Sequence, residues 1–83
     1  MDIIARSAKQ LGAVLRRYRR QRGLTQSGLA NLMHSRQATV SKLENGEPHT
    51  ELIIFIDALA ALDLELVIRP RTKASENEIE ELF

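Results

Sequence analysis

The 83-residue sequence contains no cysteine, no tryptophan and only two prolines. Without cysteine, neither a disulfide framework nor a thiolate metal site can form. His34 and His49 are the only histidines, so a zinc site is not expected either. No apolar run approaches the roughly 18 residues of a membrane span, and residues 1–10 lack the basic start and long apolar region of a signal peptide. We therefore expect a cytoplasmic protein that binds no metal, uses no cofactor and contacts no membrane.

The sequence also lacks the patterns of an enzyme. It has no nucleophile–base pair, no metal-spaced ligands and no glycine-rich phosphate loop. Eighty-three residues form one small domain, which buries about 60% of the surface that its unfolded chain exposes. Because a core of that size is marginal alone, we expect a non-enzymatic protein that associates with a second chain.

Charge is divided unevenly along the chain. Residues 1–46 carry nine basic residues against two acidic ones, a net charge of +7. Residues 47–83 carry three basic residues against nine acidic ones, a net charge of −6. The basic half suits a surface that faces phosphates, and release of counterions would make its affinity salt-dependent. A solvated helix face is the alternative for the run RRYRRQR.

The basic half contains a pattern typical of a helix-turn-helix at residues 25–46. Leu29, Leu32 and Met33 recur at helical spacing in its first half, and Val40 and Leu43 do so in the second. The outward positions of the second half carry short, polar or amide side chains that can reach base edges in a major groove: Gln37, Ala38, Thr39, Ser41 and Lys42. This pattern predicts sequence-specific binding to double-stranded DNA.

The motif TQSGLA, followed by QATVSKLENG beginning eleven residues after Gln26, resembles the Xre/Cro/phage-repressor helix-turn-helix family. Within that family, QATVS and EN followed by a short strand are most similar to the HipB-like antitoxins. The resemblance covers residues 7–69. It implies a repressor that regulates its own operon through an inverted-repeat operator and holds a HipA-like kinase toxin. Two alternatives are a stand-alone phage-type repressor without a toxin, and a protein-interaction module that has lost DNA binding.

The resemblance also assigns roles to matching residues. Gln26 corresponds to a glutamine that contacts a phosphate and braces the glutamine corresponding to Gln37; an exposed helix-start residue is the alternative. Glu44 corresponds to a glutamate that forms a structural ion pair, here with Arg19; a free surface carboxylate is the alternative. Relatives usually have glycine at the position of His34, which implies that this histidine adopts positive φ.

We expect four residues to contact bases and seven to contact phosphates. Gln37 can bond to adenine N6 and N7, Ala38 can touch a thymine methyl, and Lys42 can reach guanine. Arg36 reads a guanine or clamps a phosphate, and the sequence does not separate these roles. The expected phosphate contacts, which position without specifying sequence, are Gln26, Ser35, Thr39, Ser41, Asn45, Arg16 and Arg17. Ser35 could instead cap the following helix.

The fold that we expect is mainly α, a compact four-helix bundle of the lambda-repressor type plus one C-terminal β-strand. Residues 1–6 form an arm that packs on the domain, on a partner chain or in a minor groove, and residues 7–63 form the DNA-binding domain. Ser7 caps a first helix that ends at Gly23, and Thr25 caps the second. The third helix should span residues 37–45. The fourth should span residues 51–62 after a cap at Thr50.

The C-terminal half predicts a homodimer. The fourth helix is apolar on two faces, and a small monomer cannot bury both. In residues 64–70, apolar side chains recur at every second position (Leu64, Leu66 and Ile68), which predicts a strand that pairs with its copy in a second chain. The expected dimer contacts are Ile53, Ile56, Ala60, Leu64, Leu66 and Ile68. Such a dimer would present two helices to successive major grooves about 34 Å apart. Residues 71–83 form a flexible acidic tail that either folds on a partner or serves only solubility.

Overall fold

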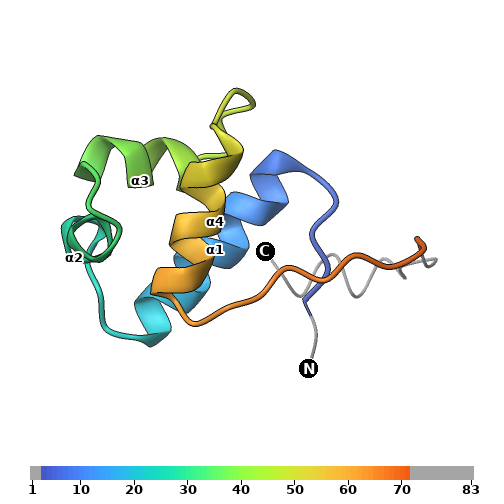
Figure 1. The fold of residues 1–83 in the computed structure, drawn as a ribbon, viewed down its shortest axis with the longest axis horizontal. Helices are drawn as coiled ribbons and strands as arrows, with labels where there is room; N and C mark the ends of the chain where they lie inside the picture. Colours follow the sequence, from blue (N-terminus) through green and yellow to red (C-terminus); the bar gives the residue numbers. More distant parts are fainter. Residues whose placement is uncertain (1–2, 72–83) are drawn as a thin grey trace.

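The computed structural model describes residues 3–71, which form four helices: α1 (Ala8–Gln21), α2 (Gln26–Leu32), α3 (Gln37–Glu44) and α4 (Leu52–Ala61). In Figure 1, α2 is seen along its axis and α3 from the side, so the two helices are steeply inclined to each other, as in a helix-turn-helix. Helix α4 lies across α1 in this view, and the segment after it runs away from the helices toward one end of the molecule.

Short polar side chains set the starts of the first two helices. Ser7 Oγ accepts a hydrogen bond from the Gln10 backbone N–H at 3.1 Å, and Thr25 Oγ1 accepts one from Gly28 at 2.9 Å. Each bond satisfies an N–H group that the helix itself leaves unpaired. The Gln10 side-chain oxygen reaches back to the backbone N–H of Arg6 at 2.6 Å, one residue earlier than in a standard capping box.

A residue in the left-handed region follows each of the four helices, with Gly46 in this role after α3. Gly23 has φ of 69° after α1, His34 has φ of 55° after α2, and Asp63 has φ of 56° after α4. His34 thus occupies the turn in the conformation that glycine would adopt most easily. The backbone N–H of Ser35 then donates to the Ala30 carbonyl at 2.8 Å, which closes the turn and aims the chain into α3.

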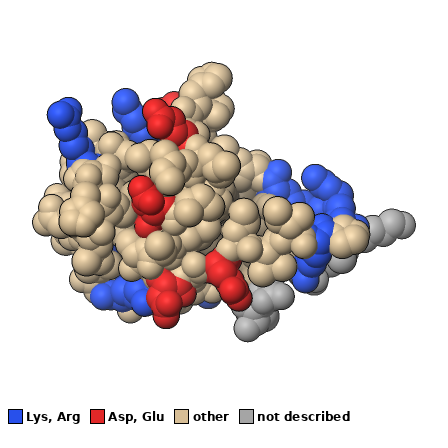
Figure 2. All heavy atoms as spheres, in the orientation of Figure 1, with Lys and Arg blue, Asp and Glu red and all other residues tan. Residues whose placement is uncertain are grey.

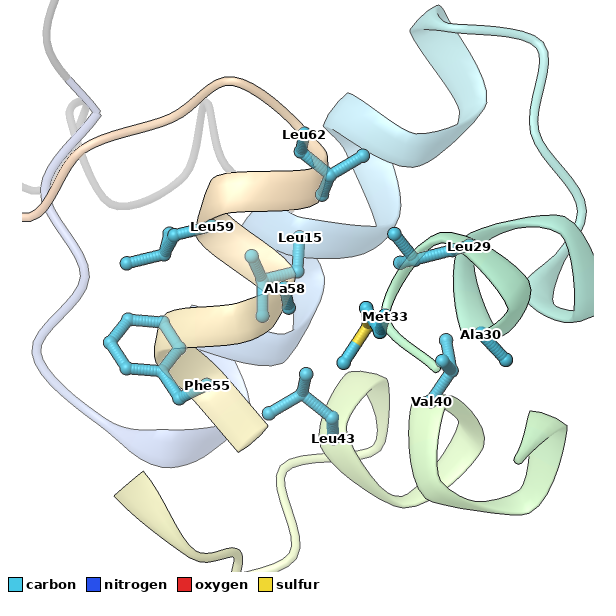
Figure 3. Close-up of a cluster of buried hydrophobic side chains, with 10 residues drawn as sticks. All are labelled: Leu15, Leu29, Ala30, Met33, Val40, Leu43, Phe55, Ala58, Leu59 and Leu62. Atoms are coloured by element: carbon cyan, nitrogen blue, oxygen red, sulfur yellow. The ribbon is translucent and has the colours of Figure 1, made fainter. Parts of the chain in front are cut away.

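Ten buried apolar side chains from all four helical segments form the core. They converge from α1, α2, α3 and the α4 segment on one region (Figure 3): Leu15, Leu29, Ala30, Met33, Val40, Leu43, Phe55, Ala58, Leu59 and Leu62. Val40 and Leu43 therefore fix one side of α3 inside the protein. The opposite side of this short helix faces away from the core.

Close backbone contact between α1 and α3 requires two glycines. A Cβ on Gly12 would lie 2.6 Å from the Leu43 carbonyl oxygen and still closer to that of Glu44. A Cβ on Gly46, whose φ is 75°, would lie 2.6 Å from the Lys9 Cα. Since real Cβ contacts are not this short, larger residues would push the two helices apart. Glycine at both positions thus allows the C-terminal end of α3 to sit directly on α1.

The predicted strand at residues 64–70 is wrong, because residues 3–71 contain no β-strand. A strand needs a neighbouring strand for its backbone hydrogen bonds, and residues 3–71 contain no second strand that could pair with this segment. Leu64 is half-buried against the protein's own core, with its N–H donating to the Leu59 carbonyl at 2.8 Å. Leu66 and Ile68 are exposed, at 53% and 90%.

Several smaller predictions are also corrected. Thr50 does not cap α4: Glu51 is the N-cap residue, and the Thr50 hydroxyl donates to the Glu47 carbonyl at 3.1 Å. Ser35 does not cap α3, whose N-cap is Arg36 without a side-chain bond. Leu32 has the helical spacing of a core residue but is 55% exposed.

The two ends of the chain lie partly outside the described residues. Of the predicted arm at residues 1–6, the described part is irregular, and both Ile3 and Ile4 are half-buried. The predicted tail at residues 71–83 lies outside the described residues except for Arg71, which is exposed. No helix among residues 3–71 is long and apolar enough to cross a membrane.

Candidate nucleic-acid interface

Helix α3 has one buried and one exposed side, as its 3.6-residue period requires. Val40, Leu43 and Glu44 are buried. Gln37, Ala38 and Lys42 are exposed, and Ser41 between them is half-buried. The amide of Gln37 therefore stands at the first turn of α3, with a methyl group beside it and an ammonium group one turn further on. Such a set can donate to, accept from and touch base edges.

The residues around α3 that we expected to contact DNA are accessible to different degrees. Arg36, the N-cap residue, is exposed, as are Asn45 at the other end of the helix and Arg17 on α1. Four others are half-buried: Arg16, Gln26, Ser35 and Thr39. The predicted base contacts thus gather on α3, whereas the predicted phosphate contacts come from three helices and the turn.

The side chains of Arg19 and Glu44 form a buried, bidentate ion pair between α1 and α3. Arg19 Nε lies 2.6 Å from Glu44 Oε2, and Arg19 Nη2 lies 3.1 Å from Oε1. The remaining guanidinium nitrogen, Nη1, donates to the Leu24 carbonyl at 2.7 Å. The Glu44 side chain is fully enclosed and that of Arg19 is 9% exposed. Because the two charges satisfy each other, neither is left unpaired in a region of low dielectric.

Two further residues donate to the same carboxylate. Arg16 Nε lies 3.3 Å from Glu44 Oε1, and Arg16 Nη2 donates to Asn45 Oδ1 at 3.3 Å. Gln26 Nε2 donates to Glu44 Oε1 at 3.2 Å. The sequence motif predicted the pair with Arg19 but not these contacts, since an arginine one turn earlier in α1 looked like a free phosphate ligand.

Burial by itself would raise the pKa of Glu44, but hydrogen bonds from Arg19, Gln26 and Arg16 and the charge of Arg19 outweigh it, so the pKa lies below its ordinary value of 4.5. Glu44 is therefore ionised at neutral pH. It ends α3, where a negative charge opposes the helix dipole. The donors from α1 and α2 offset this cost and tie the C-terminal end of α3 to both helices.

The chain of contacts continues from the core to the exposed end of α3. The side-chain oxygen of Gln26 accepts a hydrogen bond from Gln37 Nε2 at 2.6 Å. Gln37 is thus connected through Gln26 to the buried Glu44. Helix α2 therefore holds Gln37 of α3 by a side-chain hydrogen bond, in addition to the packing of the two helices in the core.

Helix α4 itself contains no Lys or Arg. In Figure 2, the face that carries α4 is largely free of Lys and Arg, which stand at its rim and beyond α3. A groove between α1 and the end of α3 is lined by Lys9, Arg16, Arg17 and Arg20. No group of His, Cys, Asp or Glu side chains in residues 3–71 could hold a metal ion.

Comparison with known proteins supplies independent information on this arrangement. Residues 10–67 match the model of a helix-turn-helix domain family. Over 75 residues the sequence is 35% identical to the antitoxin HipB of Escherichia coli (strain K12), an alignment that covers 90% of this chain and 85% of HipB. The antitoxin HipB of Escherichia coli O6:H1 is likewise 35% identical, with coverage of 90% and 80%.

Solved structures resemble the fold closely. A variant of HipB in an O2 20mer complex has a TM-score of 0.81 and 30% sequence identity, with 87% of this chain and 100% of that chain covered. A HipA–HipB–O2–O3 complex has a TM-score of 0.77 and 33% identity, with coverage of 83% and 97%. The similarity therefore extends over nearly the whole length of both proteins.

The ion pair predicts a pH-dependent stability. Because the pKa of Glu44 is lower in the folded protein than its ordinary 4.5, the stability that it adds is fully present above about pH 4.5 and is lost as pH falls through the folded value. At neutral pH, Glu44→Gln should lower the free energy of unfolding by about 3 kcal/mol, because it leaves Arg19 buried without its counterion. Urea unfolding of both proteins measures the difference.

This difference should shrink as the buffer is made more acidic, since protonation removes the charge from the parent protein too. Glu47→Gln, at an exposed carboxylate three residues away, is the matched control and should change stability by less than about 0.5 kcal/mol. A Glu44→Gln loss of equal size at neutral and acidic pH would show that the carboxylate charge does not stabilise the fold.

Proposed function

Since the chain belongs to the helix-turn-helix family that includes the antitoxin HipB, we propose that it is a sequence-specific DNA-binding repressor and the antitoxin of a HipA-like kinase toxin. It regulates its own operon by binding an inverted-repeat operator. The DNA-binding part of the proposal rests on the exposed N-terminal end of α3. This end begins with Gln37, whose side-chain amide is hydrogen-bonded to Gln26. The HipA–HipB complex among the similar structures supports the kinase partner.

Recognition in this proposal follows from the exposed side of α3. Gln37 bonds to adenine, Ala38 contacts a thymine methyl and Lys42 reaches guanine. Phosphates are bound by the polar and basic side chains that surround the helix: Gln26, Ser35, Thr39, Ser41, Asn45, Arg16 and Arg17, with Arg36 on either a base or a phosphate. Arg16 donates in part to Glu44 and Asn45, which orients it for this role.

The protein acts as a homodimer, which the apolar side of α4 supports. Ile53 and Ile56 are 57% and 40% exposed on this helix, and Ala60 is exposed beside them. Leu66 and Ile68, in the segment after the helix, are exposed aliphatic side chains as well. Ile53, Ile56 and Ala60 follow one another at helical spacing, and an exposed aliphatic face of this kind is typical of a surface that another chain covers. A twofold dimer would present two copies of α3 to an inverted repeat.

The proposal also states where the protein acts in the cell and whether it is an enzyme. An operator-binding antitoxin works in the cytoplasm, where its DNA and its toxin are found. Its task is binding, so the protein is proposed to be a regulator and not an enzyme.

Operator binding is tested with duplexes selected from a random library by the parent protein. Gln37→Ala should cost roughly 1–3 kcal/mol on the selected site and change binding to random DNA little, since phosphate contacts remain. Parent affinity should fall steeply with salt, because several phosphates release counterions. Both quantities come from fluorescence anisotropy over a salt series. Equal losses on selected and random duplexes would remove Gln37 from base recognition.

Dimerisation is tested by placing a charge on α4. Ile53→Lys should weaken self-association about tenfold or more, because an unpaired ammonium would be buried between the chains. Leu32→Lys is the matched control, since Leu32 is 55% exposed against 57% for Ile53 but lies on α2. Sedimentation equilibrium without DNA gives both constants. Unchanged association of Ile53→Lys, or equal weakening by both changes, would place the interface elsewhere.

The antitoxin part is tested by affinity purification of the tagged protein from its native host. We expect mass spectrometry to identify a HipA-like kinase among the bound proteins, in a stable complex that reforms from the purified components. Operator binding without any such kinase would instead favour the stand-alone repressor.

A further inference from the structure

We propose that the buried Glu44 determines which base Gln37 prefers, although Glu44 itself never touches DNA. The inference deepens the proposed function and rests on it: α3 must enter a major groove for the preference to be expressed. Glu44 would then be a positioning residue that acts through Gln26. The argument has three steps, one for each side chain in the chain of hydrogen bonds.

The first step concerns what Glu44 can offer to its neighbours. An ionised carboxylate accepts hydrogen bonds and donates none. Both of its oxygens receive donors from Arg19, and Oε1 also receives the Gln26 Nε2 at 3.2 Å. The side chain is fully enclosed, so bulk water does not supply a competing donor. Gln26 must therefore turn its NH₂ group, and not its oxygen, toward Glu44.

The second step follows from the shape of an amide. Its oxygen and its nitrogen lie on opposite sides of the same carbon, so an NH₂ group committed to Glu44 leaves the Gln26 oxygen on the other side. That oxygen accepts from Gln37 Nε2 at 2.6 Å. Gln37 must in turn direct an N–H, and not its oxygen, toward Gln26. The orientation is fixed by chemistry at each link, because two acceptors or two donors cannot bond to each other.

The third step is the edge that Gln37 shows to DNA. One of its N–H bonds is used on Gln26, so its oxygen and its second N–H remain, in a fixed order, for a base. Adenine offers a donor at N6 and an acceptor at N7, which match such an edge in one orientation. Turning the amide over would exchange the positions of its oxygen and its N–H. Its donor would then face the N6 donor of adenine, and its acceptor would face the N7 acceptor. The carboxylate thus favours one base pair at this position over the others.

Simple bracing does not have this consequence. A neighbour that only restricted the movement of Gln37 could bond to either side of its amide. The buried carboxylate at the start of the chain allows one orientation alone. Changing the donor or acceptor character of residue 44 or 26 should therefore alter base preference, whereas changing packing should alter affinity for all sites alike.

The experiment uses the full-length protein and the duplex selected from a random library. Gln37→Ala first identifies the base pair whose preference depends on Gln37. Affinities for the four base pairs at that position are then measured for the parent protein. One bidentate contact should give a preference of roughly 5- to 150-fold over the least favoured pair.

We call the chain of hydrogen bonds from Glu44 through Gln26 to Gln37 the relay, and three variants test it. Glu44→Gln, whose amide can donate or accept, should reduce the preference by about fivefold or more. Adding Gln26→Glu to Glu44→Gln restores an acceptor-only group next to Gln37, and the parent preference should return. Gln26→Lys keeps Glu44 and its ion pair but offers Gln37 only donors. It should turn the Gln37 amide over and move the preference to a different base pair.

Arg16→Ala is the control. It removes one partner of Glu44 but leaves the carboxylate and its contact with Gln26, so affinity should fall equally on all four duplexes while the preference remains. Circular dichroism establishes that each variant is folded at the assay temperature; if Glu44→Gln is not, Gln26→Lys decides. Parent-like preference in folded Glu44→Gln or in Gln26→Lys, or no recovery in the double variant, would overturn the relay. Failure of the parent protein to select any duplex would instead overturn the proposed function.

Discussion

The buried contact between Arg19 and Glu44 sets the position of α3, and the exposed face of the protein depends on it. A carboxylate at the C-terminal end of a helix is unfavourable alone, both for the dipole and for its desolvation. Here a bidentate guanidinium, a second arginine and an amide surround it. The arrangement works only if α1 and α3 nearly touch, which the absence of a Cβ on Gly12 allows. Packing and electrostatics therefore specify the same helix position.

In this position, the eight residues of α3 separate into a set that packs against the protein and a set that is exposed. Its buried residues join the core and the ion pair, while its first turn projects an amide that is already held by α2. A side chain fixed before binding loses less conformational entropy when it contacts a base. The dense core beneath α3 and the exposed apolar side of α4 suggest two separate tasks. In the proposed function, the first half of the chain binds DNA and the second half contacts protein partners.

Much of this could be predicted from the sequence, because it depends on local patterns. The caps at Ser7 and Thr25 follow from residue types at fixed spacing, whereas the resemblance to the repressor family implied the positive φ at His34 and the pairing of Arg19 with Glu44. The structure contains each of them. The strand at residues 64–70 was predicted wrongly, since alternation of apolar residues indicates an extended chain but cannot provide a neighbouring strand. The link from Gln26 to Glu44 could not be predicted, because it depends on how closely three helices approach one another.

The most direct measurement is methylation protection of the selected operator, which reports contacts at guanine N7 in the major groove. The account predicts two protected major-groove segments on one face of the duplex, about 34 Å apart and related by the inverted repeat. Both should disappear together when α3 loses its exposed polar side chains. Binding of the same duplex without any major-groove protection, or with only one protected segment, would contradict the claim that a dimer reads DNA with two copies of α3.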